Sequence, residues 1–208
     1  MEAKPHPAKF SEPVLEKLTK LVSPSWRVLD PFAGTGRVHT LPCETWGVEI
    51  EPEWACWNPR TIVGDALHLP FPDGSFDAIV TSVTYGNRMA DHHNAKDGSK
   101  RHTYKHYLGR DLHPNNSGQM QWGKKYQDFH VEAYQEMSRV SDRIILNVSD
   151  HIRNHKQVEV TKWHRDTLLG MGYMVLADLQ VFTKRQKQGA NAHLRAPNES
   201  IIYFLKGK

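Results

Sequence analysis

Residues Val28–Gly36 read VLDPFAGTG, an apolar run that ends in a carboxylate and continues into a loop with two glycines. A short apolar run of this kind is typical of a buried strand. Gly34 and Gly36 allow a tight turn and let the backbone approach a ligand closely. The stretch therefore predicts a strand over residues 26–30 with a ligand-binding turn at its carboxyl end.

Strand and helix patterns alternate on both sides of this turn. Further strands are predicted over residues 46–50, 61–65, 76–82, 143–148, 173–182 and 201–205, and helices over residues 11–22, 126–140 and 161–169. The last two strands could pair antiparallel. The alternation predicts an α/β fold, Rossmann-like and doubly wound, with a mostly parallel seven-stranded sheet and an antiparallel hairpin at one edge.

Length and composition favour one domain. The chain has 208 residues, 38% of them hydrophobic, so residues 1–208 are expected to form a single domain. No run of 18 apolar residues could cross a membrane and no apolar signal segment opens the sequence, which predicts a soluble, cytoplasmic protein. The two cysteines form no CxxC pair, so neither a disulfide framework nor a metal site is expected.

Basic charge is concentrated in two segments. Residues 87–125 hold eight basic and three acidic residues, and residues 184–195 hold a second basic cluster without an acid. Solvated loops would show the same charge, but two basic segments on a nearly neutral body also suit a polyanion such as nucleic acid. The insert at 87–125 adds rings that could stack on bases, those of Tyr104, Tyr107 and Trp122. The nucleic-acid-binding candidates are Arg88, Lys100, Arg101, Lys105, Trp122, Lys184, Arg185 and Arg195.

Carboxylates stand at the ends of three successive predicted strands. Asp30 ends the first, Glu49 follows nineteen residues later at the end of the second, and Asp65 follows the third. Three acids in one crevice would repel a pyrophosphate, and the loop has neither the full GxGxxG pattern nor a Walker lysine. The ligand is therefore expected to be a nucleoside with a cationic tail, and S-adenosylmethionine fits this description.

Four segments together resemble a known family. HPAKF at residues 6–10, DPFAGTG at 30–36, GVEIEP at 47–52 and GDA at 64–66 are similar to motifs of the amino-methyltransferases that modify adenine N6 or cytosine N4 in nucleic acids. The resemblance implies that Asp30 binds the methionine amino group, Glu49 the ribose and Asp65 the adenine amino group, while HPAKF helps to close the methionine end. The cofactor-binding candidates are Lys9, Phe10, Asp30, Pro31, Phe32, Ala33, Gly34, Gly36, Glu49, Ile50, Asp65 and Ala66.

The same family carries an [Asp/Asn/Ser]-Pro-Pro-[Tyr/Phe] motif after its fourth strand, and this chain has Ser82-Val83-Thr84-Tyr85 at that place. Ser82 and Tyr85 match the motif, but both prolines are missing. By the resemblance, Ser82 and the Val83 carbonyl would hold the amine, Tyr85 would stack on the flipped base, and Thr84 completes the catalytic turn. Three readings stay open: an active enzyme with a relaxed motif, an altered acceptor, or a catalytically silent binder.

The sequence thus predicts an S-adenosylmethionine-dependent methyltransferase that acts on an exocyclic amino group of a nucleic-acid base, adenine N6 or cytosine N4, with DNA favoured over RNA. Attack on the methyl group would be direct. The alternatives are an RNA base methyltransferase, for example on guanine N2, and a cofactor-binding nucleic-acid protein without catalysis. Only two basic segments are available for target recognition, so a homodimer or a specificity partner could complete it. No membrane partner is expected.

Overall fold

The computed structural model describes residues 6, 9–86, 103–183, 194 and 198–207. Its helices are α1 (Glu12–Leu21), α2 (Pro52–Ala55), α3 (Tyr104–Leu108), α4 (Lys124–Val140) and α5 (Val160–Gly170), with short 3₁₀ turns η1 (Arg37–Thr40) and η3 (Ser117–Gln119). Its strands are β1 (Arg27–Asp30), β2 (Glu44–Glu49), β3 (Thr61–Val63), β4 (Ala78–Ser82), β5 (Arg143–Val148), β6 (His151–Arg153), β7 (Lys156–Val158), β8 (Tyr173–Phe182) and β9 (Asn198–Lys206).

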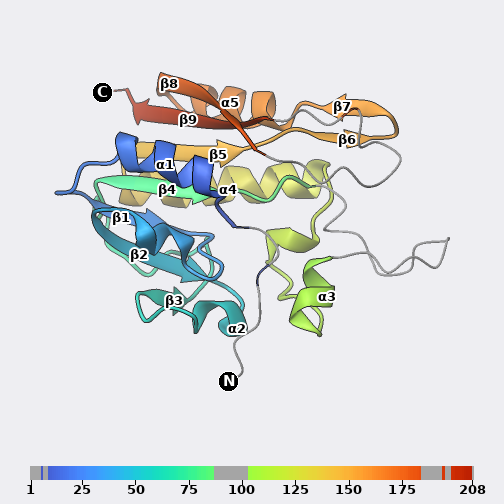
Figure 1. Cartoon of the computed structure of the whole chain (residues 1–208), viewed down its shortest axis with the longest axis horizontal. Coiled ribbons are helices and arrows are strands. Elements are labelled where there is room, and N and C mark those ends of the chain that lie inside the picture. Colours follow the sequence, from blue (N-terminus) through green and yellow to red (C-terminus); the bar gives the residue numbers. More distant parts are fainter. Residues whose placement is uncertain (1–5, 7–8, 87–102, 184–193, 195–197, 208) are drawn as a thin grey trace.

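Seven of the strands form one sheet, in the order β3-β2-β1-β4-β5-β9-β8. Strands β1 to β5 pair in parallel, whereas β9 runs antiparallel to both of its neighbours, β5 and β8 (Figure 1). The predicted Rossmann-like sheet with an antiparallel hairpin at its edge is therefore confirmed. Each predicted strand of the sheet is present within two or three residues of its expected bounds.

Helices cover both faces of this sheet because its strands are apolar on both sides. Successive residues point to opposite faces, so Val28 packs under α1 while Leu29 packs against α4 and α5. The same division separates Ile145 from Ile144 in β5. In Figure 1 α1 lies in front of the sheet, and α4 lies behind it. Each fully buried aliphatic side chain stabilises the fold by roughly 1.5–3 kcal/mol relative to an exposed one.

The sheet order creates a crevice at the carboxyl ends of its parallel strands. The chain leaves β1 toward β2 on one side, whereas β4 pairs with β1 on the other side, so the loops after β1 and β4 separate. Asp30 is the last residue of β1, Glu49 the last of β2 and Ser82 the last of β4. The topology thus brings two of the predicted acids and the first residue of the predicted acceptor turn to one edge.

The β6–β7 hairpin and the helices α2 and α3 were not predicted. The β6–β7 hairpin turns through Asn154 and His155, which both have positive φ, 49° and 60°. Two-residue hairpin turns of this kind usually have glycine at the second position. Because His155 stands there, the sequence lacks the Asn-Gly pattern that would predict the turn. Helix α3 forms inside the segment that the charge pattern marked as a polar insert. Within the described ranges, no helix is long and apolar enough to span a bilayer.

Candidate cofactor and acceptor site

A cavity of about 290 Å³ opens at the carboxyl edge of the parallel strands. Its wall includes all four residues of the predicted catalytic turn, Ser82, Val83, Thr84 and Tyr85. It also includes ten of the twelve cofactor-binding candidates: Lys9, Phe10, Asp30, Pro31, Phe32, Ala33, Glu49, Ile50, Asp65 and Ala66.

The two remaining candidates, Gly34 and Gly36, shape the turn after β1. Both have positive φ, 54° and 81°, which favours glycine. A Cβ atom on Gly36 would lie 2.6 Å from Cδ2 of His39, and one on Gly34 would lie 3.3 Å from the ring of His6. The backbone N–H of Gly34 donates to Oε2 of Glu49 over 2.9 Å. The turn therefore needs glycine both for its backbone angles and for its close contacts.

Asp30 is almost fully buried, with 2% of its surface exposed. Its Oδ1 accepts hydrogen bonds from the N–H of Phe32 at 3.0 Å and from the hydroxyl of Thr81 at 2.6 Å. Burial raises the pKa of this carboxyl to about 7, although both hydrogen bonds oppose the shift. Among the described residues none donates to Oδ2. A cation in the cavity would stabilise the ionised form, so the residue fits the amino group of a methionine moiety.

Glu49 repeats this arrangement one strand further along. Its Oε1 accepts the N–H of Glu51 at 2.8 Å and its Oε2 accepts the N–H of Gly34. Burial raises the pKa of Glu49 to about 7, and the nearby acids Glu51 and Asp30 add to the rise. Each carboxylate oxygen can accept a second hydrogen bond. Glu49 can therefore also receive the hydroxyls of a ribose.

Asp65 is held in the same manner, but it also has a partner from outside its own loop. Its Oδ1 accepts the N–H of Leu67 at 3.0 Å, so each of the three acids accepts the N–H two residues further on. Its Oδ2 accepts the side-chain amide of Asn115 at 2.7 Å. Asn115 lies in the predicted insert, which thus contributes to the wall of the cavity at the Asp65 end.

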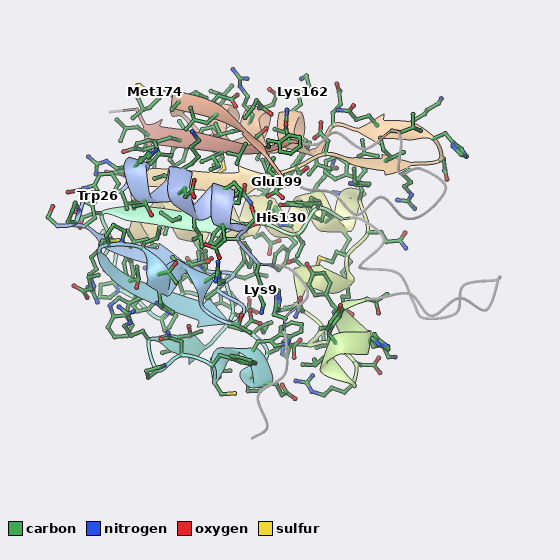
Figure 2. The ribbon with its side chains drawn as sticks, viewed as in Figure 1. Lys9, Trp26, His130, Lys162, Met174 and Glu199 are labelled. Carbon is green, nitrogen blue, oxygen red and sulfur yellow. The ribbon has the colours of Figure 1, made fainter. Side chains whose placement is uncertain are left out.

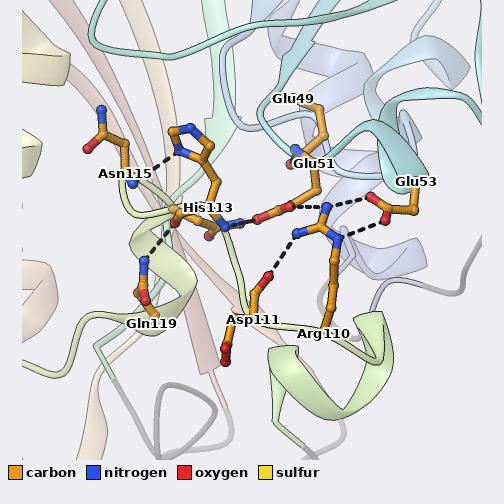
Figure 3. A network of polar contacts seen from close by, with 9 residues as sticks. Glu49, Glu51, Glu53, Arg110, Asp111, His113, Asn115 and Gln119 are labelled. Carbon is orange, nitrogen blue, oxygen red and sulfur yellow. Dashed lines mark hydrogen bonds and ion pairs between the residues drawn. The ribbon is translucent and has the colours of Figure 1, made fainter.

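Glu51 anchors that part of the insert over the cavity (Figure 3). Its carboxylate is fully buried and accepts the N–H of His113 at 2.7 Å, the amide of Asn116 at 2.8 Å and the guanidinium of Arg110 at 2.8 Å. The guanidinium of Arg110 also donates to both carboxylate oxygens of Glu53, at 2.7 and 2.9 Å. Three donors on one buried carboxylate fix the segment against the end of β2.

Several aromatic and basic residues of this segment have partners within the protein, and the binding roles of Lys105 and Trp122 stay predictions. Tyr104 is buried, packs edge-on against Trp54 with 6.2 Å between ring centroids, and lines the cavity, so it does not offer a surface for base stacking. Lys105 forms an ion pair with Asp111. Trp122 is half-buried and packs against Trp163, with 5.9 Å between ring centroids. The charge of the segment gives no sign of the contacts of these rings, because they are made by its apolar residues, which pack in the core.

The remaining nucleic-acid-binding candidates are not placed. They lie outside the described residues and stay predictions: Arg88, Lys100, Arg101, Lys184, Arg185 and Arg195.

The Ser82–Tyr85 turn is held without prolines. Val83 is 3% exposed and packs in the main core, and the hydroxyl of Thr84 donates to the carbonyl of Ser117 at 3.3 Å. The hydroxyl of Tyr126 donates to the carbonyl of Thr84. The Tyr126 side chain of α4 and the Ser117 backbone carbonyl of η3 thus restrain a turn that the related motif stiffens with two proline rings.

A buried hydrogen-bond chain supports the Thr84 carbonyl. Tyr126 also lies 2.7 Å from Nε2 of His164, whose Nδ1 lies 2.7 Å from the hydroxyl of Tyr134. Burial lowers the pKa of His164 well below its usual value, so the ring is neutral. Because Tyr126 gives its only proton to Thr84, the proton of His164 must reside on Nε2 and Tyr134 must donate to Nδ1. The chain therefore has one consistent direction.

Two side chains from distant elements complete the acceptor end of the cavity. The amide of Asn147 in β5 donates to Oγ of Ser82 at 3.3 Å and to Oε2 of Glu199 at 2.9 Å. The hydroxyl of Tyr85 donates to the same Glu199 oxygen at 3.3 Å. Glu199 lies at the start of β9 and lines the same cavity as Lys9 from the N-terminal segment; Figure 2 shows both near the middle of the molecule.

Sequence reasoning missed Glu199 and the Asn115–Ser117 segment. The search for ligand-binding acids followed strands to their carboxyl ends, whereas β9 is antiparallel and brings its first residues to this edge. Asn115 lies in the polar stretch 113–119, which has no lysine or arginine, and no sequence pattern links it to Asp65. A search for acids at the start of a predicted antiparallel strand would have found Glu199.

Comparison with known proteins agrees with this geometry. Residues 29–102 match the family model described as a methyltransferase domain. Comparison with curated proteins gives no match. The match does not extend to the amino-methyltransferases of nucleic acids, and that finer assignment stays a prediction.

Solved structures share the fold. They include the PH0226 protein from Pyrococcus horikoshii (14% identity, TM-score 0.56, covering 94% of this chain and 89% of that one). The magnesium protoporphyrin IX methyltransferase of Synechocystis, solved with bound S-adenosylmethionine, is 11% identical (TM-score 0.53, 93% and 78% covered). The 1,6-didemethyltoxoflavin-N1-methyltransferase of Burkholderia thailandensis is 14% identical (TM-score 0.51, 95% and 78% covered).

The three acids, of which Asp30 and Glu49 are buried and Asp65 is half-buried, fit the cationic, ribose and adenine parts of one ligand, and the family match covers the strands that carry them. Residues 29–102 thus match a methyltransferase domain, and the chain as a whole has the fold of solved methyltransferases, one of them with bound S-adenosylmethionine.

Proposed function

We propose that this protein is an S-adenosylmethionine-dependent methyltransferase and that it acts on an exocyclic amino group of a nucleic-acid base, adenine N6 or cytosine N4 in DNA. One observation carries the proposal. The Ser82–Tyr85 turn puts a hydroxyl acceptor and an aromatic ring in the wall of the cavity that also holds Asp30. Its first and last residues match the acceptor motif of the amino-methyltransferases, and the sequences around Lys9 and Asp30 match that family as well.

The chemistry of the acceptor explains why these residues suit it. An exocyclic amine conjugated with its ring is a poor nucleophile, and its N–H groups need acceptors while the nitrogen becomes pyramidal. Ser82 Oγ and the Val83 carbonyl can serve as these acceptors, and Tyr85 can stack on a base taken out of its helix. The cofactor supplies an electrophilic methyl group on sulfur. No covalent bond to the enzyme is needed.

A small aromatic amine is a second candidate acceptor, favoured by the described part of the insert. There Tyr104 is buried, and Arg110 and Lys105 form ion pairs with acids of the protein. Fewer basic and aromatic side chains are therefore available to bind a nucleic acid than the sequence predicts. Such an acceptor would use the same Ser82 and Tyr85 contacts and would need no basic surface.

The test is a mass analysis of methylated nucleosides. The protein is incubated with deuterated-methyl S-adenosylmethionine and unmodified DNA in one reaction, and with the same cofactor and RNA in another. Both nucleic acids are then digested to nucleosides. Deuterated N6-methyl-2′-deoxyadenosine or N4-methyl-2′-deoxycytidine from the DNA sample is the expected result. N2-methylguanosine from the RNA sample would identify an RNA enzyme instead. Absence of label from both polymers would contradict the proposal, and the same assay on free adenine, cytosine and aniline then tests the small-amine candidate.

A further inference from the structure

Glu199 shares a face of the sheet with the acceptor turn. Ser82 pairs with Asn147 across β4 and β5, and Asn147 pairs with Ile201 across β5 and β9. Side chains two residues apart on a strand point to the same face, so Glu199 lies on the face of Ile201 and Asn147. The cavity lining confirms this orientation, because Ser82 and Glu199 both contribute to it. A carboxylate thus stands beside the hydroxyl that begins the acceptor turn.

Asn147 links the two groups and fixes how each is used. This side chain is 2% exposed, and its amide gives one N–H to Ser82 Oγ and the other to Glu199 Oε2. An amide nitrogen has two protons, so both are spent. Ser82 is therefore the acceptor in its contact with Asn147, and it keeps one lone pair for a substrate N–H. Tyr85 donates to Glu199 as well, so the carboxylate holds the acceptor turn at both of its ends.

We propose that Glu199 receives the proton that the acceptor amine loses on methylation. As the nitrogen lone pair forms the N–CH₃ bond, the S–CH₃ bond breaks and its electron pair stays on sulfur. The nitrogen then carries a positive charge, and one N–H proton passes to the Glu199 carboxylate, leaving a neutral methylated amine and a protonated Glu199. Product release returns that proton to water.

The identity of residue 82 gives a separate carboxylate a role. A serine hydroxyl can accept a hydrogen bond from the amine, but it has no charge with which to stabilise the developing cation. Glu199 supplies that charge from another strand. The inference rests on the proposed function only in taking an amine as acceptor. It holds equally for a base in a polymer and for a small aromatic amine.

The variant Glu199→Gln tests the assignment with little disturbance, because the amide oxygen of glutamine can still accept from Asn147 and Tyr85. Glu132→Gln is the matched control, since Glu132 is an exposed residue of α4 away from the cavity. Binding of S-adenosylmethionine is measured by calorimetry, and methyl transfer is measured on DNA, RNA, free cytosine, aniline, catechol and a thiol. Glu199→Gln should bind the cofactor as wild type does and should lose roughly 100-fold in kcat on the amine acceptor.

A second measurement needs no turnover. Sinefungin carries a protonated amine where the methylated sulfur of the cofactor stands, and S-adenosylhomocysteine lacks it. Wild type should bind sinefungin more tightly than S-adenosylhomocysteine. That preference should fall at least fivefold in Glu199→Gln and stay unchanged in Glu132→Gln.

The outcomes separate the two proposals. Transfer to a small amine but to neither polymer, with the loss in Glu199→Gln, would overturn the nucleic-acid assignment and support Glu199. If the protein methylates DNA and Glu199→Gln does so within twofold of the wild-type rate, the nucleic-acid assignment is supported and the role of Glu199 is overturned. Transfer only to catechol or the thiol would overturn both. If no acceptor is methylated, an unchanged sinefungin preference in Glu199→Gln overturns the role of Glu199, and a lost preference supports it.

Discussion

The two walls of the cavity are stabilised in different ways. On the cofactor wall Asp30, Glu49 and Asp65 each accept the backbone N–H two residues further along, so each acid is held within its own turn. On the acceptor wall Ser82 is held by Asn147, Thr84 by Tyr126 and Tyr85 by Glu199, which are 65, 42 and 114 residues away in the chain. Each acid of the cofactor wall thus combines one local contact with a partner from another element, Thr81, Gly34 or Asn115, whereas the three contacts of the acceptor wall are all long-range.

This difference separates binding from transfer. Substitutions in the cofactor wall should remove the ligand from the enzyme, and substitutions in the acceptor wall should leave cofactor binding intact while methyl transfer is lost. Five predictions follow this division, beginning with the strongest.

Asp30→Ala should break the cofactor wall. It removes the buried carboxylate that fits the cationic end of the cofactor, and the expected loss is about 100-fold in affinity for S-adenosylmethionine, a size typical of a buried charge-assisted hydrogen bond. Isothermal titration calorimetry measures it, with Glu132→Gln as the control. Unchanged affinity would mean that the cation binds elsewhere in the cavity.

Tyr85→Ala should sharpen the division from the other side. The substitution removes the ring that stacks on the acceptor, worth roughly 10- to 100-fold in transfer if a base stacks there. Affinity for S-adenosylmethionine should stay within about twofold of wild type, because stacking contributes nothing to cofactor binding. Tyr85→Phe keeps the ring and should lose less. Full activity in Tyr85→Ala would place the acceptor away from this turn.

Acidification should weaken the cofactor wall without a mutation. The raised pKa of Asp30, about 7, means that this carboxyl is largely protonated at pH 6 and cannot pair with a cation. Affinity for S-adenosylmethionine should fall about tenfold between pH 8 and pH 6. Calorimetry across this range measures the fall, and Asp30→Asn should flatten it. If the slopes of the two proteins are equal, another group titrates.

The same shift acts on the cofactor-free protein with the opposite sign. Asp30 and Glu49 bind protons more tightly in the fold than in the unfolded chain, so the protonated forms stabilise the fold. The contribution of these two groups to the free energy of unfolding is present below pH 4 and is lost as the pH rises toward 7. Saturation with S-adenosylmethionine should reduce this loss.

Tyr126→Phe should give the smallest functional effect. It deprives the Thr84 carbonyl and Nε2 of His164 of their partner, and the free energy of unfolding should fall by about 1–3 kcal/mol. Transfer should fall severalfold while cofactor affinity is kept. Tyr134→Phe, two links further from Thr84, should destabilise the fold with less effect on transfer. Urea unfolding measures the loss of stability, and initial rates measure the loss of transfer. Equal losses of transfer in Tyr126→Phe and Tyr134→Phe would show that the contact between Tyr126 and Thr84 has no special role.

The contrast also explains what the sequence could predict. The strand before Asp30, the glycine turn and the acids Glu49 and Asp65 were found because each signal lies within a few residues. Glu199 could not be found in this way, since its role depends on an antiparallel strand placed between β5 and β8. The contact between Asn115 and Asp65 could not be predicted either, because the two residues are 50 positions apart and no local sequence pattern links them.

The place of β9 also governs how the protein is completed during synthesis. In the sheet described, β8 has β9 as its neighbour, and β9 follows β8 in the chain. While the chain emerges from the ribosome, the strands that carry Asp30 and Glu49 can assemble first, but β8 must wait for residues 198–206. Until then the open side of β5 is an unpaired edge exposed to other chains. A nascent chain would therefore acquire its cofactor wall before it acquires the carboxylate that completes the acceptor wall.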